Sequence, residues 1–125
     1  MTEWRRIVQS RTGEEVLARA RVCADFWSVF RGLQFTRGLA PGTGLLFDVR
    51  RESRSETAIH MLNVVYPIGV LWLTSGGEVV HKALAKPWRL YYGSPKPARY
   101  FIEALPDVLD RAAVGDFLLL SEVVT

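Results

Sequence analysis

The amino-acid sequence predicts a mainly β (α+β) fold, in which one compact β-barrel-like sheet of about eight strands carries two short helices. Ten glycines and six prolines punctuate the chain at short intervals, which suits short strands joined by turns. The candidate strands cluster instead of alternating with helices, which favours an antiparallel or mixed sheet. Because 125 residues is close to the usual size of one domain, we expect residues 1–125 to form a single domain around one core.

The first half of the chain predicts strands on both sides of a helix. Residues 16–22 are expected to form a strand, because small apolar side chains alternate there with a set that contains two arginines. One side of this strand would carry Ala18, Ala20 and Val22, and the other Leu17, Arg19 and Arg21. The period then changes, because Asp25 can cap a helix whose apolar stripe is Phe26, Trp27, Phe30 and Leu33. Further strands are expected at residues 4–8, 44–49 and 57–62, with a charged loop at 50–56.

The second half of the chain predicts several strands and one more helix. Ser75-Gly76-Gly77-Glu78 is a strong hairpin signal between two apolar runs. Pro106 stands where proline is tolerated at the start of a helix. The expected strands are residues 68–74, 79–85, 98–105 and 116–124, and residues 86–97 are expected to be irregular.

Charge and cysteine usage narrow the function classes. The net charge is +3, and the excess lies in residues 1–62, which hold ten arginines against seven acidic residues. A nucleic-acid partner usually leaves a stronger basic footprint, so this charge argues against one. Cys23 is the single cysteine, so no internal disulfide can form, and with no apolar run of about 20 residues we expect a cytoplasmic protein without a membrane partner.

Four blocks of the sequence resemble, in order, those of one known family. RGLQFTRGL (residues 31–39) resembles a GLM-x-R-x-x-L block, and GTGLLF (42–47) resembles a G-M-L-F strand. HMLN with YPI (60–63 and 66–68) resembles a W-M-K-N-T … P-L-D block, and FIEAL with VGD (101–105 and 114–116) resembles a V-L-E-L … G-D ending. The chain therefore resembles the domain of unknown function 192 family over roughly residues 16–122. The resemblance implies a compact β-rich single domain and brings no established activity, cofactor or catalytic residues.

The chain departs from this family in the most distinctive block. The family tends to have tryptophan, lysine, threonine and aspartate where this chain has His60, Leu62, Val64 and Gly69. If those polar residues form a site in relatives, this chain has either abandoned the site or rebuilt it around His60.

The best candidate surface is the segment that contains Trp88, Arg89 and Tyr92. Residues 86–100 hold four aromatic and four cationic side chains, and rings beside cations are what nucleotide, sugar or single-stranded nucleic-acid binding requires. We expect a mouth between this segment and residues 60–63. There Trp88 and Tyr92 would stack, Arg89 would meet an anion, and His60 and Asn63 would supply hydrogen bonds. The plainer interpretation is that these rings close one end of the barrel and the cations only aid solubility.

We expect a non-enzymatic binding or accessory domain for an unknown small molecule or protein. His60, His81 and Cys23 lie in no paired ligand motif, so we expect no metal and no other cofactor. One alternative is a small hydrolase or transferase with His60 as general base. Another is weak nucleic-acid binding through the arginine-rich first half, including Arg50, Arg51 and Arg54. The apolar final strand leaves homodimerisation open, because an unprotected edge invites pairing.

Overall fold

The structure is a computed structural model that describes residues 3–23, 40–57, 59–60, 66–87 and 91–122, with the backbone alone at residues 59, 60 and 91. Within these residues the chain forms strands of two to eleven residues and one short 3-10 helix, η1 (Pro106–Asp110). The strands are β1 (Trp4–Gln9), β2 (Glu15–Cys23), β3 (Thr43–Ser53), β4 (Ile59–His60), β5 (Ile68–Leu73), β6 (Val79–Ala85), β7 (Tyr91–Tyr92), β8 (Ala98–Ala104) and β9 (Leu118–Glu122).

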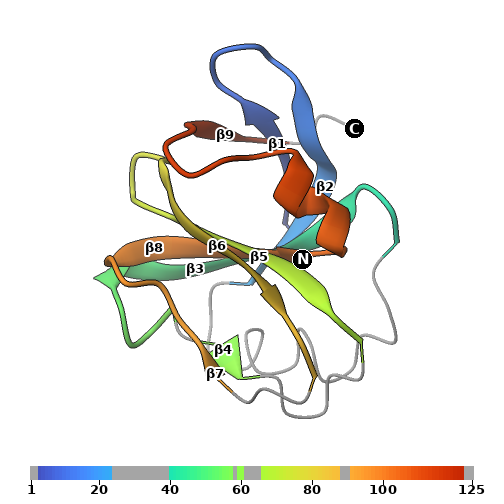
Figure 1. Cartoon of the computed structure of the whole chain (residues 1–125). Helices are drawn as coiled ribbons and strands as arrows, with labels where there is room; N and C mark the ends of the chain where they lie inside the picture. Colours follow the sequence, from blue (N-terminus) through green and yellow to red (C-terminus); the bar gives the residue numbers. More distant parts are fainter. Residues whose placement is uncertain (1–2, 24–39, 58, 61–65, 88–90, 123–125) are drawn as a thin grey trace.

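Seven of these strands form one mixed sheet in the order β6-β5-β8-β3-β2-β1-β9. Every neighbouring pair is antiparallel except β2 and β3, which run parallel. The two ends of the sheet approach each other, because Glu78 bridges Phe117 and Val79 N–H donates to the Asp116 carbonyl at 2.8 Å. The sheet therefore curls into a half-barrel (Figure 1).

The hairpin between β5 and β6 shows why its turn contains glycine. Gly77 has φ +92° and donates to the Thr74 carbonyl at 3.0 Å. A Cβ atom at Gly77 would collide with the Leu118 carbonyl oxygen, so the turn also allows the close approach of the β9 segment. The predicted hairpin is confirmed by the antiparallel pairing of β5 with β6.

The inner face of the half-barrel holds the first core cluster, and η1 covers its end. Val108 of η1 is buried in this cluster, together with Leu71 and Ile102 from the middle of the sheet. Lys82 Nζ of β6 donates to the carbonyls of Leu109 and Ala112 at 2.7 and 3.2 Å. These bonds fix the end of the η1 segment against the sheet.

The outer face of the sheet carries a second core cluster beneath β4 and β7. Phe47 and Phe101 stack there with ring centroids 4.5 Å apart, and Trp72 is fully buried beside them. Trp72 Nε1 donates to the carbonyl of Thr57 at 2.8 Å, and Tyr92 of β7 packs against the same cluster. Figure 1 shows β4 and β7 as a short ribbon below β3 and β8. The molecule thus has two apolar layers, one on each face of the sheet.

The mainly β fold is confirmed, and several local expectations need correction. Leu17 was expected on the same side as Arg19 and Arg21, but it lies in the first core cluster with Val16 and Ala20. The register shifts by one residue between Arg5–Ala20 and Ile7–Leu17, so a β-bulge in β2 rotates Leu17 to the inner face.

Other differences concern short elements. The expected loop at 50–56 begins inside β3, which runs to Ser53 through Arg50 at φ 68°. Of the expected strand 57–62 the structure describes residues 57, 59 and 60, and Ile59–His60 form β4. The segment 86–97, expected to be irregular, contains β7. The second expected helix is the 3-10 helix η1, and the first, at residues 25–33, lies outside the described residues.

The β9 strand is an edge of the sheet with apolar side chains facing solvent. Leu119 in β9 and Phe117 just before it are exposed. Homodimerisation through this edge stays a prediction. In the part of the chain that the structure describes, no helix is long and apolar enough to cross a membrane.

Candidate functional site

The five residues proposed from the sequence are only partly described. Asn63, Trp88 and Arg89 lie outside the described residues. The backbone of His60 in β4 pairs with that of Tyr91 in β7, and Ile59 pairs with Tyr92. Tyr92 is half-buried, and its hydroxyl accepts a hydrogen bond from the Lys86 N–H at 2.8 Å. The two segments that carry the expected mouth are therefore neighbours in the backbone, and the mouth itself stays a prediction.

A residue that the sequence analysis did not propose stands out on this face of the sheet. Glu103 of β8 is 1% exposed, and its Oε2 atom has no hydrogen-bond partner among the described residues. Its register neighbours are Leu45 of β3 and Val70 of β5, both buried members of the second core cluster. A carboxyl group with an unsatisfied oxygen in apolar surroundings costs free energy, so this position calls for a functional explanation.

Burial controls the protonation of this carboxyl group. Loss of solvation raises the pKa of Glu103 from 4.5 to about 8, because water no longer stabilises the charged form. Burial, and then the negative charge of Glu103, raise the pKa of Tyr66. The phenol and the carboxyl group thus lie close enough to interact. At neutral pH the site presents a protonated acid beside a phenol.

One sequence signal could have identified Glu103. Residues 100–105 read Tyr-Phe-Ile-Glu-Ala-Leu, so a carboxylate interrupts an otherwise apolar strand. A strand at the edge of a sheet can direct such a residue to solvent. β8 lies between β3 and β5, and the second core cluster covers the face that carries Glu103, so the burial of this residue depends on long-range pairing.

The site does not use the position where the resembled family tends to have aspartate. Gly69 of β5 is buried against η1, and a Cβ atom added there would lie 2.7 Å from Val108 Cγ1 and 3.2 Å from the Leu105 carbonyl oxygen. A carboxylate side chain has no room in this packing. In this chain residue 69 is therefore part of the close packing between β5 and η1.

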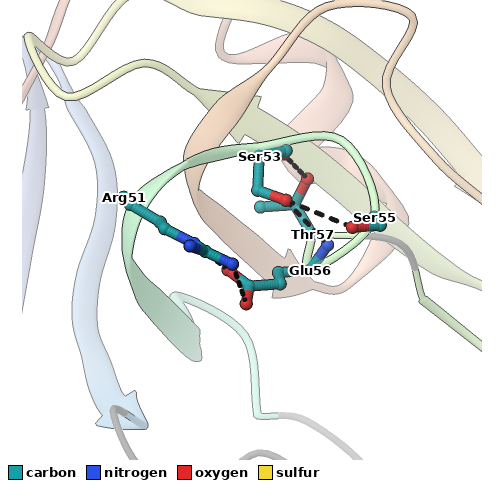
Figure 2. Close-up of polar contacts among 5 residues, drawn as sticks. All are labelled: Arg51, Ser53, Ser55, Glu56 and Thr57. Atoms are coloured by element: carbon teal, nitrogen blue, oxygen red, sulfur yellow. Dashed lines mark hydrogen bonds and ion pairs between the residues drawn. The ribbon is translucent and has the colours of Figure 1, made fainter.

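The arginine-rich end of β3 and the loop that follows it are joined by an ion pair. Arg51 donates from Nε and Nη2 to the two carboxylate oxygens of Glu56, each at 2.9 Å, and Figure 2 shows this paired geometry. The hydrogen bond from Arg51 lowers the pKa of Glu56. Behind the pair, the Thr57 hydroxyl donates to the Ser53 carbonyl at 2.7 Å. These contacts give Arg51 a structural role that competes with binding of nucleic acid.

A second arginine of this region is also paired. Arg99 of β8 forms a bidentate contact with Asp48 of β3, at 2.9 and 3.1 Å. Burial acts to raise the pKa of Asp48, but the hydrogen bonds from Arg99 and the Arg50 N–H together hold it below its usual range. This pair joins two neighbouring strands and fixes the backbone at Arg50.

The other candidate reactive groups are part of the packing. Cys23 is fully buried in the second core cluster, where its Sγ atom lies 3.8 Å from the Arg21 carbonyl oxygen. The ring of His81 lies 5.2 Å from that of Trp72, on the same face. Among the described residues, no group of three or more His, Cys, Asp or Glu side chains is arranged to hold a metal ion.

Comparison with known proteins agrees with the fold. A UPF0127 protein of Thermococcus sibiricus is 34% identical over 88% of this chain and 71% of its own length. A UPF0127 protein of Pyrococcus furiosus is 32% identical over 85% of this chain and 90% of its own length. These relatives bring no assigned activity with them.

Two crystal structures share the fold. A provisionally assigned transcription regulator from Sinorhizobium meliloti superposes with a TM-score of 0.79 over 96% of this chain and 94% of its own, at 22% identity. A protein of unknown function from Novosphingobium aromaticivorans superposes with a TM-score of 0.74 over 94% of this chain and 84% of its own, at 16% identity. At these identities the likeness concerns the fold alone. The family model of DUF192, described as "Uncharacterized ACR", matches residues 7–117, so the chain belongs to the DUF192 family.

Proposed function

We propose that this chain is a non-catalytic binding domain that takes a small ligand at the outer face of the sheet, where an apolar body meets Phe101 and Trp72 and an ammonium or similar donor meets Glu103. The proposal rests on the buried Glu103 carboxyl group, whose Oε2 atom has no hydrogen-bond partner in the part of the chain that the structure describes. A buried charge is tolerated when it is paired and hydrogen-bonded, so a cationic donor is the group that satisfies this position best.

The short ribbon of β4 and β7 supports access to this face. Among the described residues each of these strands contributes two residues, which pair Ile59 with Tyr92 and His60 with Tyr91, so the described pairing of the ribbon is short. Short segments with few hydrogen bonds open at low free-energy cost. Opening of the ribbon would expose the face that carries Glu103 without unfolding the seven-stranded sheet.

The pH dependence of binding follows from the protonation of Glu103. A cationic ligand pairs with the ionised carboxylate, so binding releases the proton that the free protein holds below about pH 8. Affinity for the cation should therefore rise as the pH increases from 6 to about 8. A neutral ligand of the same shape should show no such dependence.

Benzylammonium is a suitable probe, and benzyl alcohol is its neutral control. We expect benzylammonium to raise the urea midpoint of the wild-type protein at pH 7.5 and to leave that of Glu103→Gln unchanged. Benzyl alcohol should affect the two proteins equally. Equal stabilisation of both proteins by benzylammonium would contradict the role given to Glu103.

The hydrolase or transferase alternative, with His60 as general base, stays a prediction, because the side chain of His60 is not described. We also propose a cytoplasmic location, which the single, buried Cys23 supports, since a thiol of this kind needs no oxidising compartment. Recovery of the chain in a secreted or membrane fraction would contradict it.

A further inference from the structure

The outer side of β1 and β2 carries an aromatic ring between two arginines. Trp4 of β1 lies opposite Arg21 of β2 in the antiparallel register. The guanidinium carbon of Arg19 lies over the Trp4 ring, 4.3 Å from its centroid. Arg19 is exposed, and Trp4 and Arg21 are half-buried. We call these three residues the Trp4 platform.

The arginines of the platform differ from most other arginines of the structure in their electrostatic partners. Among the described residues, neither Arg19 nor Arg21 forms an ion pair or donates a side-chain hydrogen bond to a carboxylate. The carboxylate nearest along β2, that of Glu15, is engaged at 2.9 Å by Arg6 of β1. The arginines that do have carboxylate partners are Arg5, Arg6, Arg51, Arg99 and Arg111. The platform therefore concentrates two uncompensated positive charges on one surface.

Stacking on Trp4 prepares Arg19 to bind an anion. The guanidinium carbon lies over the ring, and a guanidinium group that stacks on an aromatic face keeps the N–H donors in its plane available. Arg19 and Arg21 are two residues apart on one strand and point to the same side, which separates their Cα atoms by roughly 6.6 Å. Two long side chains at this spacing can converge on one compact group with several oxygen atoms.

We propose that the Trp4 platform binds a phosphoryl group, with Arg19 and Arg21 each donating to its oxygens. A phosphoryl group carries about −1.5 to −2 charges near neutral pH, which matches two guanidinium groups. In the parallel register, Thr43 of β3 lies beside Arg19 and Leu45 lies beside Arg21. Both neighbours are uncharged, so β3 adds no charge next to the platform. This site is independent of the proposed site at Glu103.

The group could belong to a small phosphate ester or to a nucleic-acid backbone, and the test uses a probe for each. The probes are inorganic phosphate and a ten-nucleotide oligothymidylate, titrated at constant ionic strength against protein labelled with 15N. The readout is the chemical shift of the arginine Nε–H and tryptophan indole signals. The test variant is Arg19→Gln/Arg21→Gln, and the control with the same charge change at two exposed positions is Arg11→Gln/Arg111→Gln.

We expect both probes to shift the signals of Arg19, Arg21 and Trp4. Apparent affinity should fall at least about tenfold in Arg19→Gln/Arg21→Gln and change less than about twofold in the control. Much tighter binding of the oligonucleotide than of phosphate, with a steep salt dependence, would identify a nucleic-acid backbone as the source. Comparable binding of the two probes would identify a small ester. Unchanged platform signals with both probes, or equal loss of affinity in both variants, would overturn the proposal.

Discussion

Glu103→Gln is expected to stabilise the folded protein at pH 7 by about 3 kcal/mol. The folded protein keeps Glu103 protonated up to about pH 8, whereas the unfolded chain releases this proton near pH 4.5. Between these values the folded state binds one more proton, so stability falls as the pH rises, by about 1.4 kcal/mol per pH unit. Glutamine is close in shape to the protonated acid and does not titrate, so the variant avoids this loss.

Urea unfolding between pH 4 and pH 9 measures this effect. The wild-type free energy of unfolding should decline between about pH 4.5 and 8 and then level off, and the variant should lack that part of the decline. Glu14→Gln is the control, because Glu14 is exposed and its substitution removes the same charge. A decline of equal steepness in wild type and Glu103→Gln would show that Glu103 does not hold its proton through folding.

Gly69→Asp, which introduces the residue that the family tends to have, is expected to cost at least about 4 kcal/mol of stability. The new Cβ would lie 2.7 Å from Val108 Cγ1, and overpacking of this kind costs about 1–3 kcal/mol. The carboxylate would also be buried beneath η1 without an established partner, which adds a desolvation cost of several kcal/mol. Against a typical domain stability of about 5–15 kcal/mol, a loss of this size removes a large fraction of the free energy of unfolding.

Gly69→Ala separates the two causes in the same position. Alanine adds the Cβ atom without the charge, so its cost should stay within the range of about 1–3 kcal/mol for overpacking alone. Thermal unfolding of the three proteins at pH 7 gives the comparison. If Gly69→Asp were as stable as wild type, η1 would have to move aside for the carboxylate. That result would show that this chain can accommodate a polar side chain at residue 69.

Elements with local signals could be predicted from the sequence. The β5–β6 hairpin follows from Ser75-Gly76-Gly77-Glu78, and β8 follows from a short apolar run between Pro97 and Pro106. β4 lies within the strand expected at residues 57–62, whereas β7 has no such local signal, because its pairing with β4 across the chain creates it. The bulge that turns Leu17 inward is also a property of the β1–β2 register and leaves no mark in the alternation of β2.

The candidate site was predicted less well, for a related reason. The sequence pattern favoured side chains that can bind a ligand by hydrogen bonding or stacking, such as His60 and Trp88. The burial of Glu103 follows only from the fold, because the second core cluster around it forms when β3 and β5 pair with β8. Likewise, the alternation of Arg19 and Arg21 predicted their common side, but Trp4 joins them only through the register of β1 with β2.

In the proposed site Glu103 is a buried, protonated acid that is retained for a ligand, and its Oε2 atom has no hydrogen-bond partner among the described residues. The carboxyl 13C signal of Glu103, assigned by its absence from Glu103→Gln, reports this directly when it is followed from pH 3 to pH 10. The structure predicts a titration midpoint near pH 8 in the free protein and a lower midpoint when benzylammonium is bound. A midpoint near pH 4.5 in the free protein, like that of an exposed glutamate, would contradict the claim.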